Sequence, residues 1–463
     1  MRILPTAAAL GALLLSTPAG AQQRARQAPP PLGTPKAFHL PTRREFTLAN
    51  GMKVTFVPFG NIPKVTVMNT VRTGNIDEEP GHTWLADVTG ELMREGTTTR
   101  TALQLAELGA SMGGAVSVGI GEDVSQIGGT VLSEGGPEMV RLVADVTRNP
   151  RLPESELPRI IAGRLRSLAI AKSQPGSIAQ EKFMSSIYGD HTYGRIFPSE
   201  SELKSYTIAQ ARDFYARNFG AARSHLYVVG VFDEKAMERA VRESFTDWKA
   251  GAPKSSHPAQ AHASAMVTLI DRPNAPQSTI DMGLPVLAAT SPDFVALQVT
   301  DAILGGTFGS RITTNIREQK GYTYSPRSSI TSHPGTSVWS EQADVTTKDT
   351  GASLKEIFAE IARLQAEAPP AAELEGVKNN MIGIFTLQNA SRGGIASQLV
   401  NADVLGLGPD YLSTYVGRVS AVTPADVQRL AKDQIRADRM TIVVVGDKKT
   451  VEEQLAPYQH PVP

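Results

Sequence analysis

The chain has 463 residues, enough for roughly two to four domains, and its 41% hydrophobic and 20% charged residues supply buried cores. Lys plus Arg and Asp plus Glu both total 46, so the formal charge is zero, and no basic field favours a nucleic acid partner. Cysteine is absent, which excludes disulfides, thiolate metal sites and a cysteine nucleophile.

The first 21 residues have the pattern of a secretory signal peptide. Arg2 supplies a positive charge, residues 7–15 form an apolar run, and Ala-Gly-Ala at 19–21 fits the small-x-small cleavage rule. The run is shorter than the ~20 apolar residues of a membrane span, so an uncleaved anchor is the less favoured alternative. We expect cleavage after Ala21, a periplasmic or secreted bacterial location, and a flexible Gln-, Arg- and Pro-rich leader over residues 22–40.

The remainder divides into two related halves, residues 41–250 and 266–463, joined by an Ala-, Pro-, Ser- and His-rich linker at 251–265. Residues 207–230 and 423–446 each read as a Thr-capped amphipathic helix, a short loop and an apolar strand that ends in Gly. Their offset of 216 residues nearly equals the 217 residues between two Glu-Leu pairs, at 156–157 and 373–374. Two segments that keep one offset indicate a duplicated domain.

In chain order, strands and helices mix within each half. Alternating and β-branched residues predict the strands, and apolar residues at helical spacing predict the helices. In the first half we expect strands at 53–58, 65–72, 115–119 and 124–132, and helices at 83–94, 101–108, 137–148, 154–172 and 178–188. In the second half we expect helices at 294–304, 354–366 and 373–388, and strands at 322–330 and 337–345. The pattern predicts two α+β lobes, each a mainly antiparallel sheet with helices packed on one face.

The order of several short motifs resembles the pitrilysin/insulinase family of zinc peptidases, whose metal motif is H-x-x-E-H. They are F-T-L-A-N-G-M at 46–52, E-G-T at 95–97, G-T-V-L at 129–132, R-N-P at 148–150, H-T-Y-G-R at 191–195 and the stretch 304–325. No single motif is diagnostic, but their order and spacing span nearly the whole mature chain. The resemblance implies two similar lobes arranged as a clam shell.

The family's metal motif falls on a degenerate sequence in this chain. Counting back from the Gly-Thr at 96–97, its three positions are Asp87, Gly90 and Glu91. Both histidines are missing, and the glutamate that would take a proton from zinc-bound water is a glycine. We therefore expect no metal at these positions.

The family's third metal ligand, a glutamate on a later helix, is also missing. The matching helix carries Arg159, Arg164 and Arg166, and residues 157–180 contain no acidic residue. Arginine cannot ligate a cation. Asp87 and Glu91, at i and i+4, could in principle hold Mg²⁺ or Ca²⁺, although two carboxylates are few and solvated charges are the favoured interpretation. His82 lies close to this helix but has no partner at helical spacing, and His257 and His262 lie in the linker.

The second half keeps other elements of the family. Arg317 and Tyr324 match an arginine and a tyrosine seven residues apart, which by resemblance reach toward the scissile peptide near the metal. A tyrosine hydroxyl can donate to a forming oxyanion, and an arginine can hold a substrate carbonyl. The alternative is that Arg317 caps a helix end and Tyr324 packs in the sheet. Gly305 and Gly306 match the family's substrate-steering loop, with a plain tight turn as the alternative.

A further substrate contact is expected in the first half. Residues 113–119, which include Ser117 and Val118, predict an inner edge strand rich in small side chains. A peptide could add there as an extra strand, although a plain strand is equally consistent with these residues.

We expect a non-catalytic subunit of a heterodimeric periplasmic zinc metalloendopeptidase that acts on peptides. It would carry no cofactor itself and would pair with a homologous H-x-x-E-H-bearing subunit that holds the zinc. One alternative is a peptide-binding or structural peptidase-like module with no role in catalysis. A self-sufficient zinc protease is less favoured, because its metal ligands are absent. The sequence leaves open the peptide substrate and whether the chain pairs with itself or with a partner.

Overall fold

The structure is a computed structural model that describes residues 39–459. The predicted signal peptide at 1–21 and most of the predicted leader at 22–40 lie outside the described residues. Within residues 39–459, no helix is both long and apolar enough to span a membrane.

The first half forms a six-stranded, mainly antiparallel sheet in the order β1-β2-β6-β3-β5-β4. The β2–β6 pair alone runs parallel, because β6 returns from the end of the half to lie between β2 and β3. The strands are β1 (Arg44–Thr47), β2 (Lys53–Pro58), β3 (Lys64–Val71), β4 (Ser117–Ile120), β5 (Ser125–Leu132) and β6 (Ser224–Gly230).

The helices of the first half follow its amphipathic segments closely. A core of apolar side chains joins α1, α3 and α7 to one face of the sheet. The helices are α1 (Leu85–Met93), α2 (Ala102–Ser111), α3 (Gly136–Arg148), α4 (Leu157–Ser173), α5 (Pro175–Tyr188), α6 (Glu200–Ser205), α7 (Ile208–Asn218) and α8 (Glu234–Phe245).

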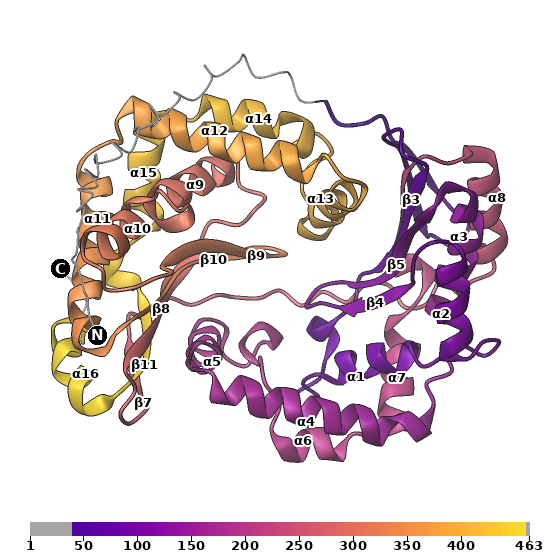
Figure 1. Ribbon diagram of the computed structural model, residues 1–463, viewed down its shortest axis with the longest axis horizontal. Coiled ribbons are helices and arrows are strands. Elements are labelled where there is room, and N and C mark those ends of the chain that lie inside the picture. Colours follow the sequence, from indigo (N-terminus) through magenta and orange to yellow (C-terminus); the bar gives the residue numbers. More distant parts are fainter. Residues whose placement is uncertain (1–38, 460–463) are drawn as a thin grey trace, which may run out of the picture. The chain divides into compact units, whose positions relative to one another are not determined.

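The second half repeats this topology in a five-stranded sheet of order β7-β11-β8-β10-β9, with β7–β11 as its parallel pair. Its strands are β7 (Val267–Asp271), β8 (Gln277–Val286), β9 (Arg327–His333), β10 (Thr336–Thr346) and β11 (Thr441–Gly446). Its main helices are α9 (Phe294–Asp301), α10 (Arg311–Thr313), α11 (Thr350–Ala366), α12 (Ala371–Gln388), α13 (Arg392–Leu405), α14 (Tyr411–Ala421), α15 (Pro424–Gln434) and α16 (Lys448–Leu455). Two related α+β lobes are therefore confirmed (Figure 1).

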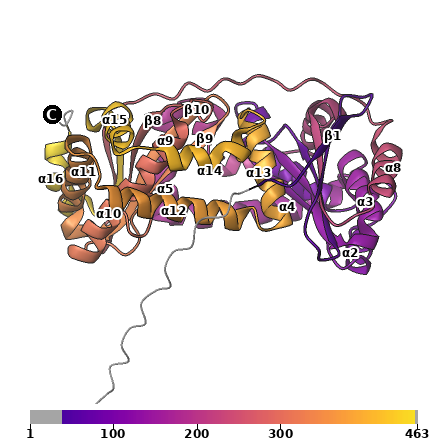
Figure 2. The same cartoon turned by 90° about the horizontal axis from the view of Figure 1, so that it is seen from above.

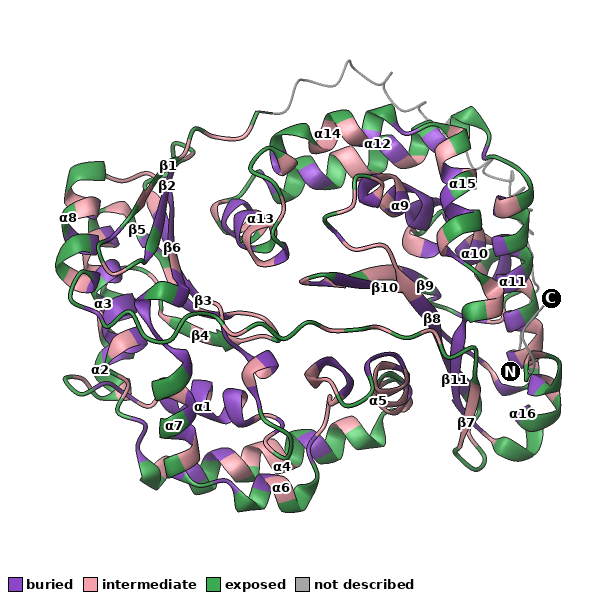
Figure 3. Ribbon diagram, turned by 180° about the vertical axis from the view of Figure 1, so that it is seen from behind, coloured by how far each residue is buried: buried purple, intermediate pink, exposed green. Residues whose placement is uncertain are grey.

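The duplicated segments have the same local chemistry in both halves. Thr207 and Thr423 each cap their helix in a reciprocal capping box, with Gln210 and Asp426 respectively. The strand that follows each helix, β6 or β11, is almost entirely buried and has a neighbouring strand on each side (Figure 3). The offset seen in the sequence therefore corresponds to one repeated helix–strand unit.

Each half sends one helix onto the sheet of the other half. Helix α5 packs on β8 and β11, where Phe183 and Ile187 join Val443 and Val445 in a buried cluster. Its counterpart α13 packs on β3 and β6, where Ile395 and Leu399 join Tyr227 and Val229. In Figure 2, α12, α14 and α13 extend from the second-half helices toward the first sheet. In each half, helices of the same half cover one face of the sheet, as predicted. A helix from the other half covers part of the opposite face.

Several predicted elements have different boundaries in the structure, and two of these differences affect the candidate site. The strand predicted at 322–330 begins only at Arg327, so Tyr322 and Tyr324 lie in the preceding loop, where Thr323 forms an isolated bridge to Val345. The helix predicted at 294–304 is α-helical only to Asp301 and continues as a π-helix, Ala302–Gly306. Tertiary packing decides both boundaries. Residues 251–266 contain no helix or strand.

A carboxyl group is buried where α5 covers the second sheet. Asp281 of β8 is 1% exposed, and burial raises its pKa to about 7, against the opposing effect of the hydrogen bond that Gln342 donates. Because the folded state holds the proton more tightly than the unfolded state, the stabilisation is complete below pH ~4 and disappears as pH rises through about 7.

We therefore expect the free energy of unfolding to fall by roughly 1–4 kcal/mol between pH 5 and pH 8. Asp281→Asn, which is neutral at every pH, should flatten this dependence, and the exposed Asp190→Asn should leave it unchanged. Urea unfolding at several pH values measures the slope. Equal slopes in Asp281→Asn and the native protein would contradict the assignment.

Candidate functional site

Helix α1 begins at a fixed and strained turn. Trp84 precedes it with φ at +70°, a left-handed conformation that a bulky residue rarely adopts. The buried carboxylate of Glu78 accepts hydrogen bonds from the backbone N–H groups of Trp84 and Ala86, at 3.1 and 2.9 Å, and so caps the helix. Burial, and to a lesser extent the charge of Asp87, raises the pKa of Glu78 to about 8, against those hydrogen bonds. The helix that carries the degenerate metal positions is therefore held rigidly at its start.

Asp87 and Glu91 do not face an open coordination site. Arg164 of α4 lies between them, with its Nη1 3.3 Å from Asp87 Oδ1 and its Nε 2.6 Å from Glu91 Oε1. The second oxygen of Asp87 accepts a hydrogen bond from Asn75 at 2.8 Å. A guanidinium that belongs to the chain thus supplies the positive charge that these carboxylates require. The pair is not free to take Mg²⁺ or Ca²⁺ without displacing it.

Gly90, the position predicted to match the family's catalytic glutamate, lies against a neighbouring side chain. A Cβ atom added at Gly90 would lie 2.4 Å from Cγ1 and 2.8 Å from Cδ1 of Ile120, at the end of edge strand β4. The helix therefore packs directly on that strand, and a longer side chain at position 90 requires Ile120 to move. The space for a general base is occupied by hydrocarbon.

The histidines do not complete a metal site. His82 shares a hydrogen bond with Gln210 at 3.0 Å and stacks on Tyr206. Among residues 39–459, no group of three or more His, Asp and Glu side chains is arranged to hold a metal ion. The residues present therefore do not fit the zinc of the family motif. His460 lies outside the described residues.

The second-half candidates come together around one guanidinium. Arg317 lies in a second π-helix, Thr314–Gln319, and its Cζ is 4.3 Å from the ring centre of Phe308 and 5.1 Å from that of Tyr324. The two rings are 73% and 79% exposed, whereas the Arg317 side chain is 21% exposed. Tyr324 therefore does not pack in the sheet, and its hydroxyl is open to an incoming group. π-Helical turns occur frequently at functional sites.

Two buried networks anchor the segment that carries Arg317. Arg311 forms a bidentate pair with Glu373 of α12, with both N···O distances 2.8 Å. Asn315 donates one hydrogen bond to Glu360 at 2.8 Å and one to Glu356 at 3.0 Å, both on α11. The wide helical turn is thus fixed to two neighbouring helices.

Gly305 and Gly306, predicted in a loop, instead end the π-helix Ala302–Gly306 and lie on buried carboxyl groups. A Cβ at Gly305 would meet Glu341 Oε2 at 2.6 Å, and one at Gly306 would meet Asp301 Oδ2 at 2.6 Å. Burial raises the pKa of Asp301 to about 6 and that of Glu341 well above its usual range. The two glycines are therefore required by this close approach, with or without a substrate. Neither has a positive φ.

The first-half substrate candidates lie on β4, which forms the open edge of its sheet. Ser117 is exposed, although its hydroxyl donates to the carbonyl of Gly128 at 3.0 Å, and Val118 is half-buried against the core. No hydrogen bond or ion pair among the described residues joins Arg317 or Tyr324 to β4 or to α1. The structure thus assembles two separate groups of candidates, one in each half.

The sequence analysis missed two contributors to these groups. Arg164 was identified as a residue that cannot bind metal, but not as the ion-pair partner of Asp87 and Glu91. Phe308 was passed over within the glycine-rich loop. The sequence did contain a signal for Phe308. A large aromatic residue flanked by glycines has few neighbouring side chains to pack on and can be expected to be exposed.

Two family models match consecutive parts of the chain. The one described as Insulinase (Peptidase family M16) matches residues 60–198, and the one described as Peptidase M16 inactive domain matches residues 205–381. An uncharacterised zinc protease of Streptomyces coelicolor is 22% identical over 418 residues, which cover 88% of this chain and 90% of that protein. One from Mycobacterium tuberculosis is 26% identical over 361 residues, covering 76% of this chain and 79% of that protein.

Solved structures share the fold. The peptidase M16 inactive domain from Pseudomonas fluorescens superposes with a TM-score of 0.79 at 23% identity, covering 88% of this chain and 98% of that one. A Helicobacter pylori protease gives 0.81 at 18% identity, covering 88% and 100%. The periplasmic protease PqqL from Escherichia coli gives 0.77 at 14% identity, covering 90% of this chain but 48% of PqqL. With its two repeated lobes in the clam-shell fold and its degenerate metal helix, the chain belongs to the M16 (insulinase) family of peptidases.

Proposed function

We propose that this chain is the non-catalytic subunit of a heterodimeric zinc endopeptidase and supplies Arg317 and Tyr324 to a metal-bearing partner. One contrast carries the proposal. The metal positions of α1 are engaged by Arg164 and Ile120, whereas Tyr324 and Phe308 are exposed around a held guanidinium. A chain that bound zinc itself would need the α1 positions open to the metal, and here Arg164 and Ile120 occupy them.

The chemistry available to the second group suits peptide hydrolysis by another subunit's zinc. The exposed hydroxyl of Tyr324 can donate a hydrogen bond to the oxyanion that forms when water attacks a peptide carbonyl. The guanidinium edge of Arg317 can donate to a substrate carbonyl while its faces rest on the two rings. Donors held in place before reaction stabilise developing charge without the cost of reorienting.

Further support comes from comparing the length of this chain with that of PqqL. The chain matches about half of PqqL, as a subunit would match half of a single-chain enzyme with two such units. We further propose that the partner is a homologous chain with an intact H-x-x-E-H helix that holds the zinc. From the signal-like N-terminus, we propose that both chains work outside the cytoplasm, in the periplasm or beyond.

One observation favours a second candidate, a peptide-binding module without a catalytic role. Aromatic rings contact Arg317 from both Phe308 and Tyr324, and Glu318 lies 3.3 Å from its Nη1. A guanidinium with these contacts can simply stabilise the loop. Kinetics with a partner chain separates the two candidates.

Alone, the chain should leave test peptides intact, and it should raise the cleavage rate of an H-x-x-E-H-bearing homologue when the two are mixed. In the mixture we expect Tyr324→Phe and Arg317→Ala each to lower kcat by roughly 10²-fold, because each removes one donor to the transition state. Arg239→Ala, on the exposed face of α8, is the matched control. Size-exclusion chromatography should show that the variants still form the complex.

A partner rate that does not change on mixing would favour the binding module. Full activity of both variants in a mixture that does respond would exclude the roles given to Arg317 and Tyr324. One equivalent of zinc that survives dialysis of the isolated chain, together with turnover, would instead indicate a self-sufficient protease.

The claim that Ile120 fills the space beside Gly90, where the family would have its general base, can be tested by mutation. We expect Gly90→Ala to lower the free energy of unfolding by roughly 1–3 kcal/mol, because the new methyl group overlaps Ile120. In an Ile120→Ala background, the same substitution should be neutral or stabilising by up to ~1 kcal/mol, because alanine favours the helix. Urea unfolding of the four proteins of this cycle gives the coupling. An effect of Gly90→Ala that is the same in both backgrounds would show that Ile120 does not fill this position.

A further inference from the structure

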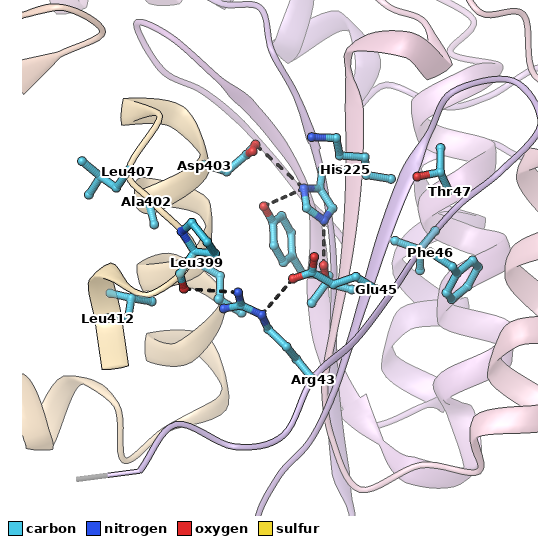
Figure 4. A pocket seen from close by; sticks show the side chains of 16 residues that line it. Arg43, Glu45, Phe46, Thr47, His225, Leu399, Ala402, Asp403, Leu407 and Leu412 are labelled. Carbon is cyan, nitrogen blue, oxygen red and sulfur yellow. Dashed lines mark hydrogen bonds and ion pairs between the residues drawn. The ribbon is translucent and has the colours of Figure 1, made fainter. Parts of the chain in front are cut away.

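A pocket of about 390 Å³ lies where α13 crosses the first sheet, far in sequence from Arg317. Its volume falls within the range of small-molecule sites. Strands β1, β2 and β6 form one wall, and α13, the following loop and the start of α14 form the other. Figure 4 shows Leu399, Leu407 and Leu412 on the second-half side and Arg43, Glu45 and His225 on the first-half side.

The two walls differ in chemistry. The second-half wall is mainly hydrocarbon, with the side chains of Leu399, Leu407 and Leu412. The first-half wall presents hydroxyl, imidazole and charged groups, from Thr47, Lys53, Thr55, His225 and Tyr227 together with Arg43 and Glu45. A ligand that fits both walls needs an aliphatic part and a polar part at opposite sides.

Most charges at the pocket are already paired within the protein. Arg43 Nε lies 2.8 Å from Glu45 Oε1. Asp403 lies 3.6 Å from Arg72 and 3.8 Å from His225. Burial raises the pKa of Asp403, but the interactions with His225, Arg72 and Lys53 outweigh it and hold that pKa below its usual value. Both carboxylates of the pocket are therefore neutralised locally.

His225 is likewise fixed by its neighbours. Its Nε2 is 2.8 Å from the hydroxyl of buried Thr55, and its Nδ1 is 2.9 Å from the hydroxyl of Tyr227, whose ring stacks on the imidazole. With both ring nitrogens engaged, the imidazole shapes the wall and leaves the binding of a ligand to other groups.

Lys53 differs from these groups. It is exposed at the start of β2, and within residues 39–459 its ammonium forms no hydrogen bond or ion pair at contact distance. On β1, Thr47 is paired directly opposite Lys53 in the strand register and brings a second exposed donor to the same rim. The pocket thus combines an apolar wall with a cation that has no contact-distance partner among the described residues.

We propose that this pocket binds a small carboxylate that carries an aliphatic side chain. The carboxylate is held by the ammonium of Lys53, and the side chain lies on Leu399, Leu407 and Leu412. The C-terminus of a short peptide that ends in an aliphatic residue has this chemistry, and so does a free aliphatic acid. The site is independent of the function proposed for Arg317 and Tyr324.

Isothermal titration calorimetry of the full chain tests the proposal with three probes. N-acetyl-L-leucine represents a peptide C-terminus, hexanoate a free aliphatic acid, and N-acetyl-L-leucinamide a ligand without the charge. We expect at least one of the two acids to bind with a Kd on the order of 1 mM or lower, and the amide at least tenfold more weakly. Binding of N-acetyl-L-leucine alone would identify a peptide C-terminus, and hexanoate binding would extend the site to free acids.

Variants locate the ligand. Lys53→Met should weaken acid binding at least tenfold, Lys53→Arg should keep it within about threefold, and Lys235→Met on α8 is the matched control. Leu407→Asn, at a half-buried position, should weaken both acids and leave the fold unchanged by circular dichroism. The proposal is overturned if neither acid binds at 10 mM (about ten times the expected Kd), if the amide binds as well as the acids, or if Lys53→Met binds like the native protein.

Discussion

The exchange of one helix between the two halves joins them into one structure. Helix α5 leaves the first half to cover β8 and β11, and α13 leaves the second half to cover β3 and β6. A sheet with one uncovered apolar face would need another partner, so each half lacks a complete core without the other. The exchange also buries Asp281 and creates the pocket beside Lys53.

At the positions predicted to match the family's metal motif, the structure shows an ion pair and apolar packing. In a metal site, a divalent cation balances its carboxylate ligands and a nearby base activates water. Here Arg164 balances Asp87 and Glu91, and Ile120 fills the space beside Gly90. An unpaired carboxylate pair or a cavity would each cost stability, so both replacements keep the helix packed.

The second half illustrates the opposite case, in which exposure is retained. Phe308 and Tyr324 remain largely in solvent although a large apolar surface there contributes little to the fold. The segment between them is fixed by Arg311 and Asn315, and the residues just before Phe308 are fixed by the close approach of Gly305 to Glu341. Rigid support beneath an exposed aromatic and basic group is the arrangement expected of a surface that recognises something.

The sequence could predict the features that local interactions determine, but not those that depend on contacts between residues distant in sequence. Motif order and the repeated helix–strand unit identified the family and the two lobes, because capping boxes and amphipathic periods are local properties. The π-helical turns at Ala302–Gly306 and Thr314–Gln319, and the late start of β9, could not be found in this way. The two π-helical turns contact Glu341 of β10 and Glu360 of α11, which lie tens of residues away in sequence.

The same distinction applies to the candidate sites. By itself, the sequence predicted that the family's metal ligands are missing and that Arg317 and Tyr324 have the family spacing, since residue identity and spacing can be read along one chain. Only the tertiary structure decided that Arg164 pairs with Asp87 and Glu91, that Ile120 packs against Gly90, and that Lys53 and three leucines of the other half line one pocket. These pairings join residues tens to hundreds of positions apart, and the exchange of α5 and α13 is the physical reason that the two halves meet.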